Sequence, residues 1–223
     1  MPFDVRPKYA TFDCYGTLIH WQMNDVTRQV LGDRLPPDQA DAFLDSFSIY
    51  RFDEVMGDWK PYGQVIADAL QRAATRHGIE LRSGDGEQIY AAIPTWGPHP
   101  DVPDGLARLA EHVPLVILSN ATDDQIVHNV ELLGAPFAEV LTAEQAGAYK
   151  PRLAAFEYML DKLGCAPGEI VHVSSSPRYD HMSAYDLGIR NTVYVNRGDE
   201  PSAPFYYRAE IPDVSHLPGL FGL

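Results

Sequence analysis

The sequence predicts an α/β fold: a doubly wound, mostly parallel, Rossmann-like sheet with a helical cap inserted after the first strand. Two observations carry this prediction. Short apolar runs of strand type alternate with helical patterns over residues 104–195, whereas residues 21–94 show almost only helical patterns. The apolar run at residues 9–12 precedes the helical stretch and forms the first strand. We therefore predict a core domain of residues 1–20 and 95–223 and a helical cap domain of residues 21–94.

The individual elements follow from apolar spacing and from residues that start or stop helices. In the cap we expect helices at residues 25–31, 36–50 and 63–77 and a short one up to residue 93. In the core we expect strands at residues 114–118, 140–142, 170–173 and 192–195. The core helices are expected at residues 104–112, 122–133, 153–163 and 180–187. Gly78 and Gly164 each follow a predicted helix, as C-terminal glycines commonly do. The proline-rich tail, residues 196–223, is expected to be mostly irregular, with one short strand or helix that docks Ile211.

The composition excludes several classes of partner. The chain has 223 residues, with 31 acidic and 17 basic side chains and a formal net charge of −14. This charge repels nucleic acid and anionic membranes, so an anionic substrate would need a local positive pocket. No apolar run approaches the roughly 18 residues of a membrane span, and the start shows no signal segment. The cysteines Cys14 and Cys165 fit a reducing compartment, so a cytoplasmic location is expected.

The first predicted strand ends at Asp13, and Gly16 permits a tight turn soon afterwards. Parallel α/β sheets bind their ligands at the carboxyl ends of the strands, where a carboxylate can act as a nucleophile. An aspartate in an ordinary turn is the alternative, because Asp and Gly are both common turn residues.

Three later stretches place polar side chains near strand ends or helix starts. Ser119 and Asn120 follow the second strand, Lys150 precedes Pro151 at a helix start, and a hydroxyl-rich stretch leads to Asp180. Taken singly, these residues have ordinary interpretations as helix caps or solvated surface. Four such stretches in chain order indicate a catalytic site at one edge of the sheet.

With these four motifs the sequence resembles the haloacid dehalogenase (HAD) superfamily over residues 9–195. The first motif of that superfamily normally reads Asp-x-Asp, but Tyr15 stands at its second position. The first acidic position of the last motif falls on Ser175, while the final aspartate is kept as Asp180. Both changes remove groups that phosphoryl transfer needs, a general acid and a metal ligand. The resemblance therefore disfavours a magnesium-dependent phosphatase.

The motifs resemble instead the L-2-haloacid dehalogenase branch, which uses neither a metal nor an organic cofactor. The resemblance implies hydrolytic dehalogenation of short (S)-2-haloalkanoic acids to 2-hydroxy acids. Asp13 would attack C2 of the substrate, expel the halide and form an aspartyl ester, which water then hydrolyses. A small haloacid is thus the expected partner, and a homodimer through the cap helices is expected from the resemblance.

The resemblance also assigns roles. Lys150 would keep Asp13 ionised, Thr17 would orient it, and Asp180 would activate water with the help of Ser175 and Ser176. The residues expected to contact substrate are Tyr15, Ser119 and Asn120 in the core and Arg51 and Trp59 in the cap.

Three departures from that branch leave alternatives open. Phe156 replaces a tyrosine, Ser176 replaces an asparagine, and the interval to Asp180 is one residue longer. The alternatives are another HAD-type substrate, namely fluoroacetate, a small ring carboxylate or a phosphate ester, and a catalytically inactive binding module.

Overall fold

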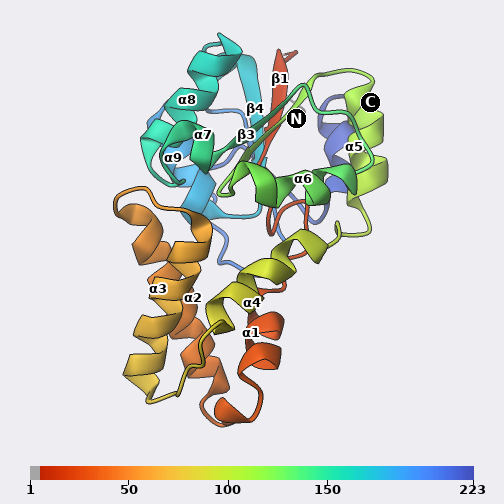
Figure 1. Ribbon diagram of the computed structural model, residues 1–223. Coiled ribbons are helices and arrows are strands. Elements are labelled where there is room, and N and C mark those ends of the chain that lie inside the picture. Colours follow the sequence, from red (N-terminus) through yellow and green to blue (C-terminus); the bar gives the residue numbers. More distant parts are fainter. Residues whose placement is uncertain (1–5) are drawn as a thin grey trace. The chain divides into compact units, whose positions relative to one another are not determined.

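The computed structural model describes residues 6–223 (Figure 1). The chain divides into two compact units, a core unit that runs to His20 and resumes at Gly97–Leu223, and a cap unit, Trp21–Trp96. The expectation of no signal segment falls in part on residues 1–5, which lie outside the described residues. Among the helices that the structure describes, none is long and apolar enough to cross a membrane.

The core unit is built on one parallel sheet. Within residues 6–223 its strands are β1 (Tyr9–Phe12), β2 (Leu115–Ser119), β3 (Glu139–Thr142), β4 (Ile170–Ser174), β5 (Thr192–Val195) and β6 (Ala209–Ile211), in the order β3-β2-β1-β4-β5-β6. Every neighbouring pair is parallel. Strand β1 is central, with Phe12 opposite Ile117 on one side and Val173 on the other. The predicted fold class is confirmed.

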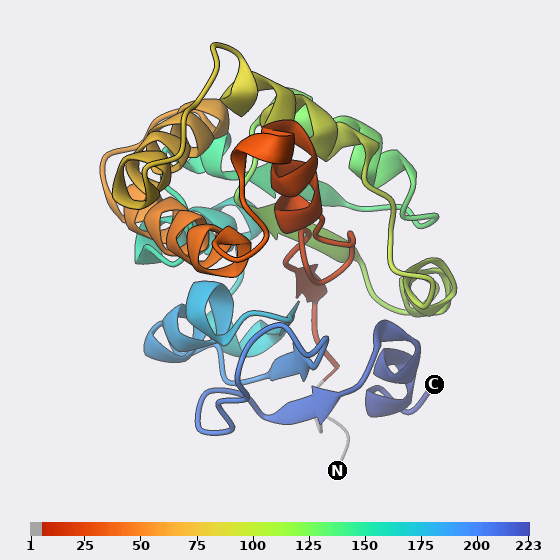
Figure 2. The same ribbon diagram turned by 90° about the horizontal axis from the view of Figure 1, so that it is seen from below.

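Helices cover both faces of this sheet. They are α5 (Val102–Ala110), α6 (Asp123–Glu131), α7 (Ala143–Ala146), α8 (Leu153–Leu163), α9 (Met182–Asp186) and α10 (Leu217–Leu220), with short turns η3 (Pro167–Glu169), η4 (Pro177–His181) and η5 (Val214–His216). Helices α7, α8 and α9 lie on one side of the strands and α5 on the other (Figure 1). Helix α10 packs against α5 (Figure 2).

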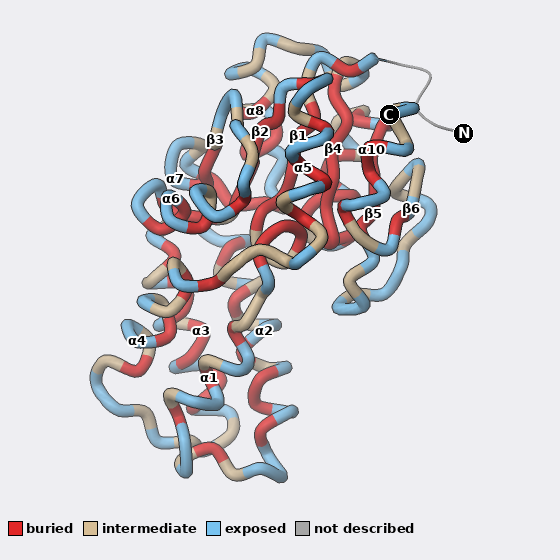
Figure 3. Tube along the Cα trace, turned by 90° about the vertical axis from the view of Figure 1, so that its right-hand side faces the viewer, coloured by how far each residue is buried: buried red, intermediate tan, exposed pale blue. Residues whose placement is uncertain are grey.

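The hydrophobic core lies between the sheet and these helices, and β2, β4 and β5 are buried along their whole length (Figure 3). Val116 and Leu118 pack with Phe156 and Met159 of α8. Alternation along β2 directs Leu115 and Ile117 to the opposite face. Gly105 lets α5 approach η5 closely, because a Cβ there would lie only 2.8 Å from the carbonyl oxygen of Val214.

One helix of the core unit differs from its expected bounds, and the tail adopts one of its two expected forms. The helix expected at 180–187 starts earlier, as the π-helical turn η4, because the Ser176 hydroxyl accepts a hydrogen bond from the Tyr179 amide and caps that turn. In the tail, β6 extends the sheet by pairing Ile211 with Val195. The expected docking of Ile211 therefore takes the form of an edge strand.

The cap unit is helical. It comprises α1 (Met23–Leu31), η1 (Gly32–Arg34), α2 (Ala40–Met56), α3 (Tyr62–His77), α4 (Asp85–Ala92) and η2 (Ile93–Thr95). Helices α2 and α3 pack along each other, and α4 packs on α1 and α3. Gly78 ends α3 in a left-handed conformation, φ 68°. Arg34 forms a two-pronged ion pair with the buried Asp85 at 2.6 and 3.0 Å.

Candidate active site

The four polar stretches meet at one edge of the core sheet. Strands β1, β2 and β4 are adjacent and parallel, so the residues that follow them share an edge. Asp13 follows β1, and its amide donates to the carbonyl of Val173, 3.0 Å away, at the end of β4. Lys150 lies between α7 and α8, and Asp180 lies in η4. The order of the strands thus brings together residues up to 167 positions apart.

A buried lysine joins the two aspartates of this site. The Nζ of Lys150 lies 2.7 Å from Oδ1 of Asp13 and 2.8 Å from Oδ1 of Asp180. All three side chains are buried. Because a buried charge is tolerated only with a partner, the ammonium and the two carboxylates depend on one another.

These contacts set the protonation of the three groups. Burial raises the pKa of Asp13 above its ordinary value, although Lys150 opposes that rise. Burial also acts to raise the pKa of Asp180, but Lys150 and His172 outweigh it and hold that pKa well below the usual range. For Lys150, burial acts to lower the pKa, and the two carboxylates raise it above its ordinary value. Asp180 is therefore the more firmly ionised aspartate.

The second oxygen of Asp13 is held by Thr17, on the turn that follows β1. Thr17 Oγ1 lies 2.6 Å from Oδ2 of Asp13 and 3.1 Å from Oγ of Ser175. The single hydroxyl proton of Thr17 serves the shorter contact, to Asp13, and Oγ of Ser175 is the more distant acceptor. The Ser175 amide donates to Thr17 Oγ1, at 2.8 Å. Ser175 therefore orients Thr17, which in turn orients Asp13.

Glycine and two charged side chains shape that turn. Gly16 has φ 92°, a conformation that residues with a side chain rarely adopt. Arg197, after β5, donates to the carbonyl of Thr17 at 2.9 Å and forms a two-pronged ion pair with Asp101 at 2.8 and 2.9 Å. The turn that carries Thr17 is thus tied to the segment after β5 and, through Arg197, to Asp101 before α5.

Asn120 holds Lys150 through its backbone. Its Nδ2 donates to the Lys150 carbonyl at 2.8 Å, and its Oδ1 accepts from the Lys150 amide at 2.7 Å. The residue expected to contact substrate therefore has both of its amide atoms engaged with the loop that presents Lys150.

A histidine that the motifs do not include completes the contacts of Asp180. His172 Nε2 lies 2.9 Å from Oδ1 of Asp180, and its Nδ1 lies 2.8 Å from Oγ1 of Thr11. Thr11 and His172 are cross-strand partners on β1 and β4. An imidazole inside an otherwise apolar strand is a signal in the sequence that a polar partner must exist.

The remaining serines of the site have different surroundings. The Ser176 hydroxyl donates to Oε1 of Glu200 at 2.7 Å, and the Ser176 carbonyl accepts from the Asp180 amide at 3.2 Å. Burial raises the pKa of Glu200, a residue that the sequence motifs did not indicate. Ser119 is buried, and its hydroxyl has no hydrogen-bond partner among the described residues.

Tyr15, at the position where the superfamily carries a second aspartate, has a partner in α6. Its hydroxyl donates to Oδ1 of Asn129 at 2.7 Å. Asn129 is buried in α6. The Tyr15 hydroxyl is thereby oriented by a neutral amide.

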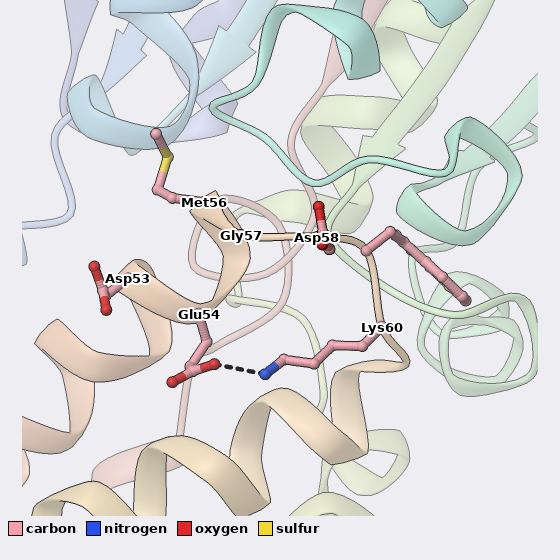
Figure 4. A pocket seen from close by; sticks show the side chains of 7 residues that line it. Asp53, Glu54, Met56, Gly57, Asp58 and Lys60 are labelled. Carbon is pink, nitrogen blue, oxygen red and sulfur yellow. Dashed lines mark hydrogen bonds and ion pairs between the residues drawn. The ribbon is translucent and has the colours of Figure 1, made fainter.

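The two cap residues expected to contact substrate lie on and just after α2. Arg51 is buried, with its guanidinium 4.8 Å from the Phe47 ring centre and 5.3 Å from that of Trp21. It forms no ion pair with a carboxylate in the part of the chain that is described. Trp59 lines a pocket of about 570 Å³ in the cap unit, which Figure 4 shows with Lys60 paired to Glu54. The roles of Arg51 and Trp59 in substrate binding stay predictions.

Comparison with known proteins identifies the family of this site. A model of the haloacid dehalogenase-like hydrolases matches residues 7–184, most of the chain. The chain belongs to this family of hydrolases. Among curated proteins, the hydrolase is 28% identical over 204 residues to (S)-2-haloacid dehalogenase 4A of Burkholderia cepacia, an alignment that covers 86% of this chain and 84% of that one.

Solved structures carry the same fold as the hydrolase. One L-2-haloacid dehalogenase superposes with a TM-score of 0.83 at 23% identity, over 99% of this chain and all of that one. The L-2-haloacid dehalogenase of Xanthobacter autotrophicus with chloropropionic acid covalently bound superposes with a TM-score of 0.78 at 21% identity, over 97% and 98% of the chains. At these identities the likeness concerns the fold alone.

Proposed function

We propose that this hydrolase converts short (S)-2-haloalkanoic acids to 2-hydroxy acids through an ester on Asp13. The observation that carries the proposal is the Asp13–Lys150–Asp180 arrangement. It supplies a fixed carboxylate for attack at carbon, a cation that keeps this carboxylate ionised, and a second carboxylate for the later hydrolysis. The haloacid dehalogenases among the relatives support the same chemistry.

In the first step, an oxygen of Asp13 forms a bond to C2 of the substrate as the carbon–halogen bond breaks. The electron pair of that bond leaves with the halide, and the configuration at C2 inverts. Thr17 and Lys150, each bonded to one carboxylate oxygen, hold Asp13 in a fixed orientation for this in-line attack.

In the second step, water attacks the ester carbonyl carbon of Asp13. Asp180 accepts one proton from that water, the bond from the carbonyl carbon to the ester oxygen on C2 breaks, and the departing oxygen takes that proton from Asp180, while the second proton of the water is released to solvent. The 2-hydroxy acid leaves and the Asp13 carboxylate is restored. Lys150 remains beside the carbonyl oxygen, where it stabilises the negative charge that develops during attack.

Recognition of an anionic acid by a chain of net charge −14 requires local donors and cations. The unpartnered hydroxyl of Ser119 is suited to a substrate carboxylate. Arg51, a buried cation without a carboxylate partner among the described residues, is the proposed second contact. Trp59 is proposed to line the halide pocket.

The homodimer expected through the cap helices is part of the proposal. Helix α2 exposes two large apolar side chains, Ile49 and Met56, which lie seven residues apart and hence on one face. Sedimentation equilibrium measures the association state.

Halide release and isotope transfer test the reaction. Enzyme is cycled with (S)-2-chloropropionate in ¹⁸O-water, returned to ordinary water and given substrate for one turnover. We expect ¹⁸O in the product, because the labelled oxygen is that of Asp13. Direct attack of water on C2 would give an unlabelled product and contradict the ester mechanism.

A substrate panel tests the specificity. It contains 2-chloro and 2-bromo acids, fluoroacetate, a small ring carboxylate and a phosphate ester, with Asp13→Asn as the inactive control. Turnover of the phosphate ester without halide release from any haloacid would overturn the proposal, as would binding of a haloacid without turnover.

A further inference from the structure

We propose that His172 is a positioning residue for ester hydrolysis, which holds Asp180 through Oδ1 and leaves Oδ2 free to take the proton of the attacking water. The inference rests on the proposed function and assigns a role to a residue outside the family motifs. It follows from the unequal surroundings of the two oxygens of Asp180.

Both donors to Asp180 reach the same oxygen. Lys150 Nζ and His172 Nε2 lie 2.8 and 2.9 Å from Oδ1. Oδ2 is buried and has no hydrogen-bond partner among the residues described. A buried carboxylate oxygen without a donor is unfavourable unless water or a ligand serves it. Oδ2 is thus the oxygen with a vacant lone pair and, since no donor reduces its electron density, the more basic one.

The proton on His172 has a defined place. The carboxylate oxygen can only accept, so Nε2 carries the hydrogen that faces Asp180. In the neutral imidazole Nδ1 then accepts from the hydroxyl of Thr11, which lies 2.8 Å from Nδ1 but 3.4 Å from the Val171 carbonyl. Thr11 and His172 have no exposed surface, so water does not compete for these bonds.

The hydrogen bonds from Thr11 to His172 and from His172 to Asp180 fix the orientation of the Asp180 carboxylate relative to the sheet. Thr11 lies on β1 and His172 opposite it on β4, so the two strands set the position of the imidazole. Rotation of the Asp180 side chain would break the bond to His172. The restraint matters for the second step, because the basic oxygen must face the ester carbonyl of Asp13.

Substitution of His172 is therefore expected to slow hydrolysis of the ester more than its formation. In the first step Asp13 attacks carbon while Asp180 transfers no proton. In the second step Asp180 accepts the proton of water. His172→Phe keeps a ring of similar shape and removes the donor, whereas His172→Gln retains an amide N–H that can reach Asp180.

The experiment is rapid-quench kinetics with excess (S)-2-chloropropionate, with halide release and intact protein mass followed together. We expect His172→Phe to keep a burst of about one halide per enzyme, to accumulate alkylated protein, and to turn over at least about 100-fold more slowly. His172→Gln should accumulate less ester and recover part of the rate. Phe156→Leu is the matched control. The ring centres of Phe156 and His172 lie 5.5 Å apart, so the substitution changes the packing of His172, but Phe156 has no hydrogen-bond donor in its side chain for Asp180.

Three results would overturn the inference. The His172→Phe enzyme could hydrolyse its ester at the wild-type rate, or its halide burst could fall by the same factor as its steady-state turnover. The third result is that Phe156→Leu accumulates as much ester as His172→Phe. If the His172→Phe protein does not fold, His172→Gln and Thr11→Val, which removes the hydroxyl at Nδ1, carry the same comparison.

Failure of the proposed function has a separate signature, namely that the wild-type enzyme releases no halide from any haloacid. In that case carbon-13 NMR titration of the aspartates decides the role of His172. Loss of the imidazole donor should raise the pKa of Asp180, and an unchanged pKa would overturn the positioning role.

Discussion

Asn120 pairs twice with the backbone of Lys150, through a donor at 2.8 Å and an acceptor at 2.7 Å. One side chain thereby joins the loop after β2 to the loop before α8. The ammonium of Lys150, buried between Asp13 and Asp180, is placed by this backbone contact as well as by its own ion pairs.

Replacement of Asn120 by Asp should disturb Lys150 more than replacement by Ala. The carboxylate keeps an acceptor for the Lys150 amide, but its other oxygen faces the Lys150 carbonyl and repels it. We expect a loss of about 1–3 kcal/mol in the free energy of unfolding, measured by urea denaturation, together with slower halide release. Full activity and stability in Asn120→Asp would show that the double pairing does not position Lys150.

Removal of the buried cation should destabilise the protein in a pH-dependent way. Lys150→Met leaves Asp13 and Asp180 buried without a counter-charge, at a cost of about 3–5 kcal/mol at neutral pH. The pKa values of both carboxylates then rise in the folded state above their unfolded values, so the folded state binds more protons and the deficit shrinks as the pH falls. Urea denaturation at pH 7 and pH 5 measures this difference. A deficit that is the same at both values would contradict the ion-pair explanation.

Ser119→Ala should separate stability from substrate binding. The Ser119 hydroxyl is buried without a partner among the described residues, so its removal abolishes an unsatisfied polar group. We expect the free energy of unfolding to stay the same or to rise by about 1–2 kcal/mol, while KM for the haloacid increases. Loss of stability with an unchanged KM would indicate that the hydroxyl serves the fold.

His181 should make the protein sensitive to acid. Burial lowers the pKa of His181 from 6.5 to about 4, and its Nε2 donates to the Ser174 carbonyl at 2.9 Å. Below pH 6.5 the unfolded chain takes up a proton at this residue and the folded protein does not, so stability falls as the pH drops from 6.5 towards 4. The loss amounts to about 3 kcal/mol at its limit.

The neutral variant His181→Gln isolates that effect. It keeps an N–H donor for Ser174 but cannot be protonated in this range. Urea midpoints at pH 7.5, 6 and 5 should therefore fall less steeply for His181→Gln than for the natural protein. Parallel pH dependences in the two proteins would show that His181 is not the group responsible.

Much of the fold could be predicted from local pattern, because apolar periodicity and glycine or proline breaks act over a few residues. The strands, the long helices and the helical insertion after β1 are of this kind. The π-helical start of η4 was missed because it depends on the cap by Ser176. The segment around Ile211 was expected as a short strand or helix, and local pattern did not decide between them because a strand of three residues carries little pattern.

The candidate site shows the same division. Asp13, Lys150 and Asp180 stand out in the sequence because each lies at a break between a regular element and a loop. The role expected for Ser175 beside Asp180 stays a prediction, and its contact with Thr17 could not be read from the sequence. Glu200 escaped notice because nothing near it in the sequence marks it as a neighbour of Ser176.

The sequence by itself determined the fold class, the family motifs and the types of side chain at the ends of the strands. These depend on residue identity and on short-range spacing. Only the tertiary structure decided which atoms meet, such as Thr11 with His172, 161 residues apart, and His172 with a single oxygen of Asp180. The physical reason is that strand order and register bring distant residues within hydrogen-bond distance, and neither is contained in any one segment of the chain.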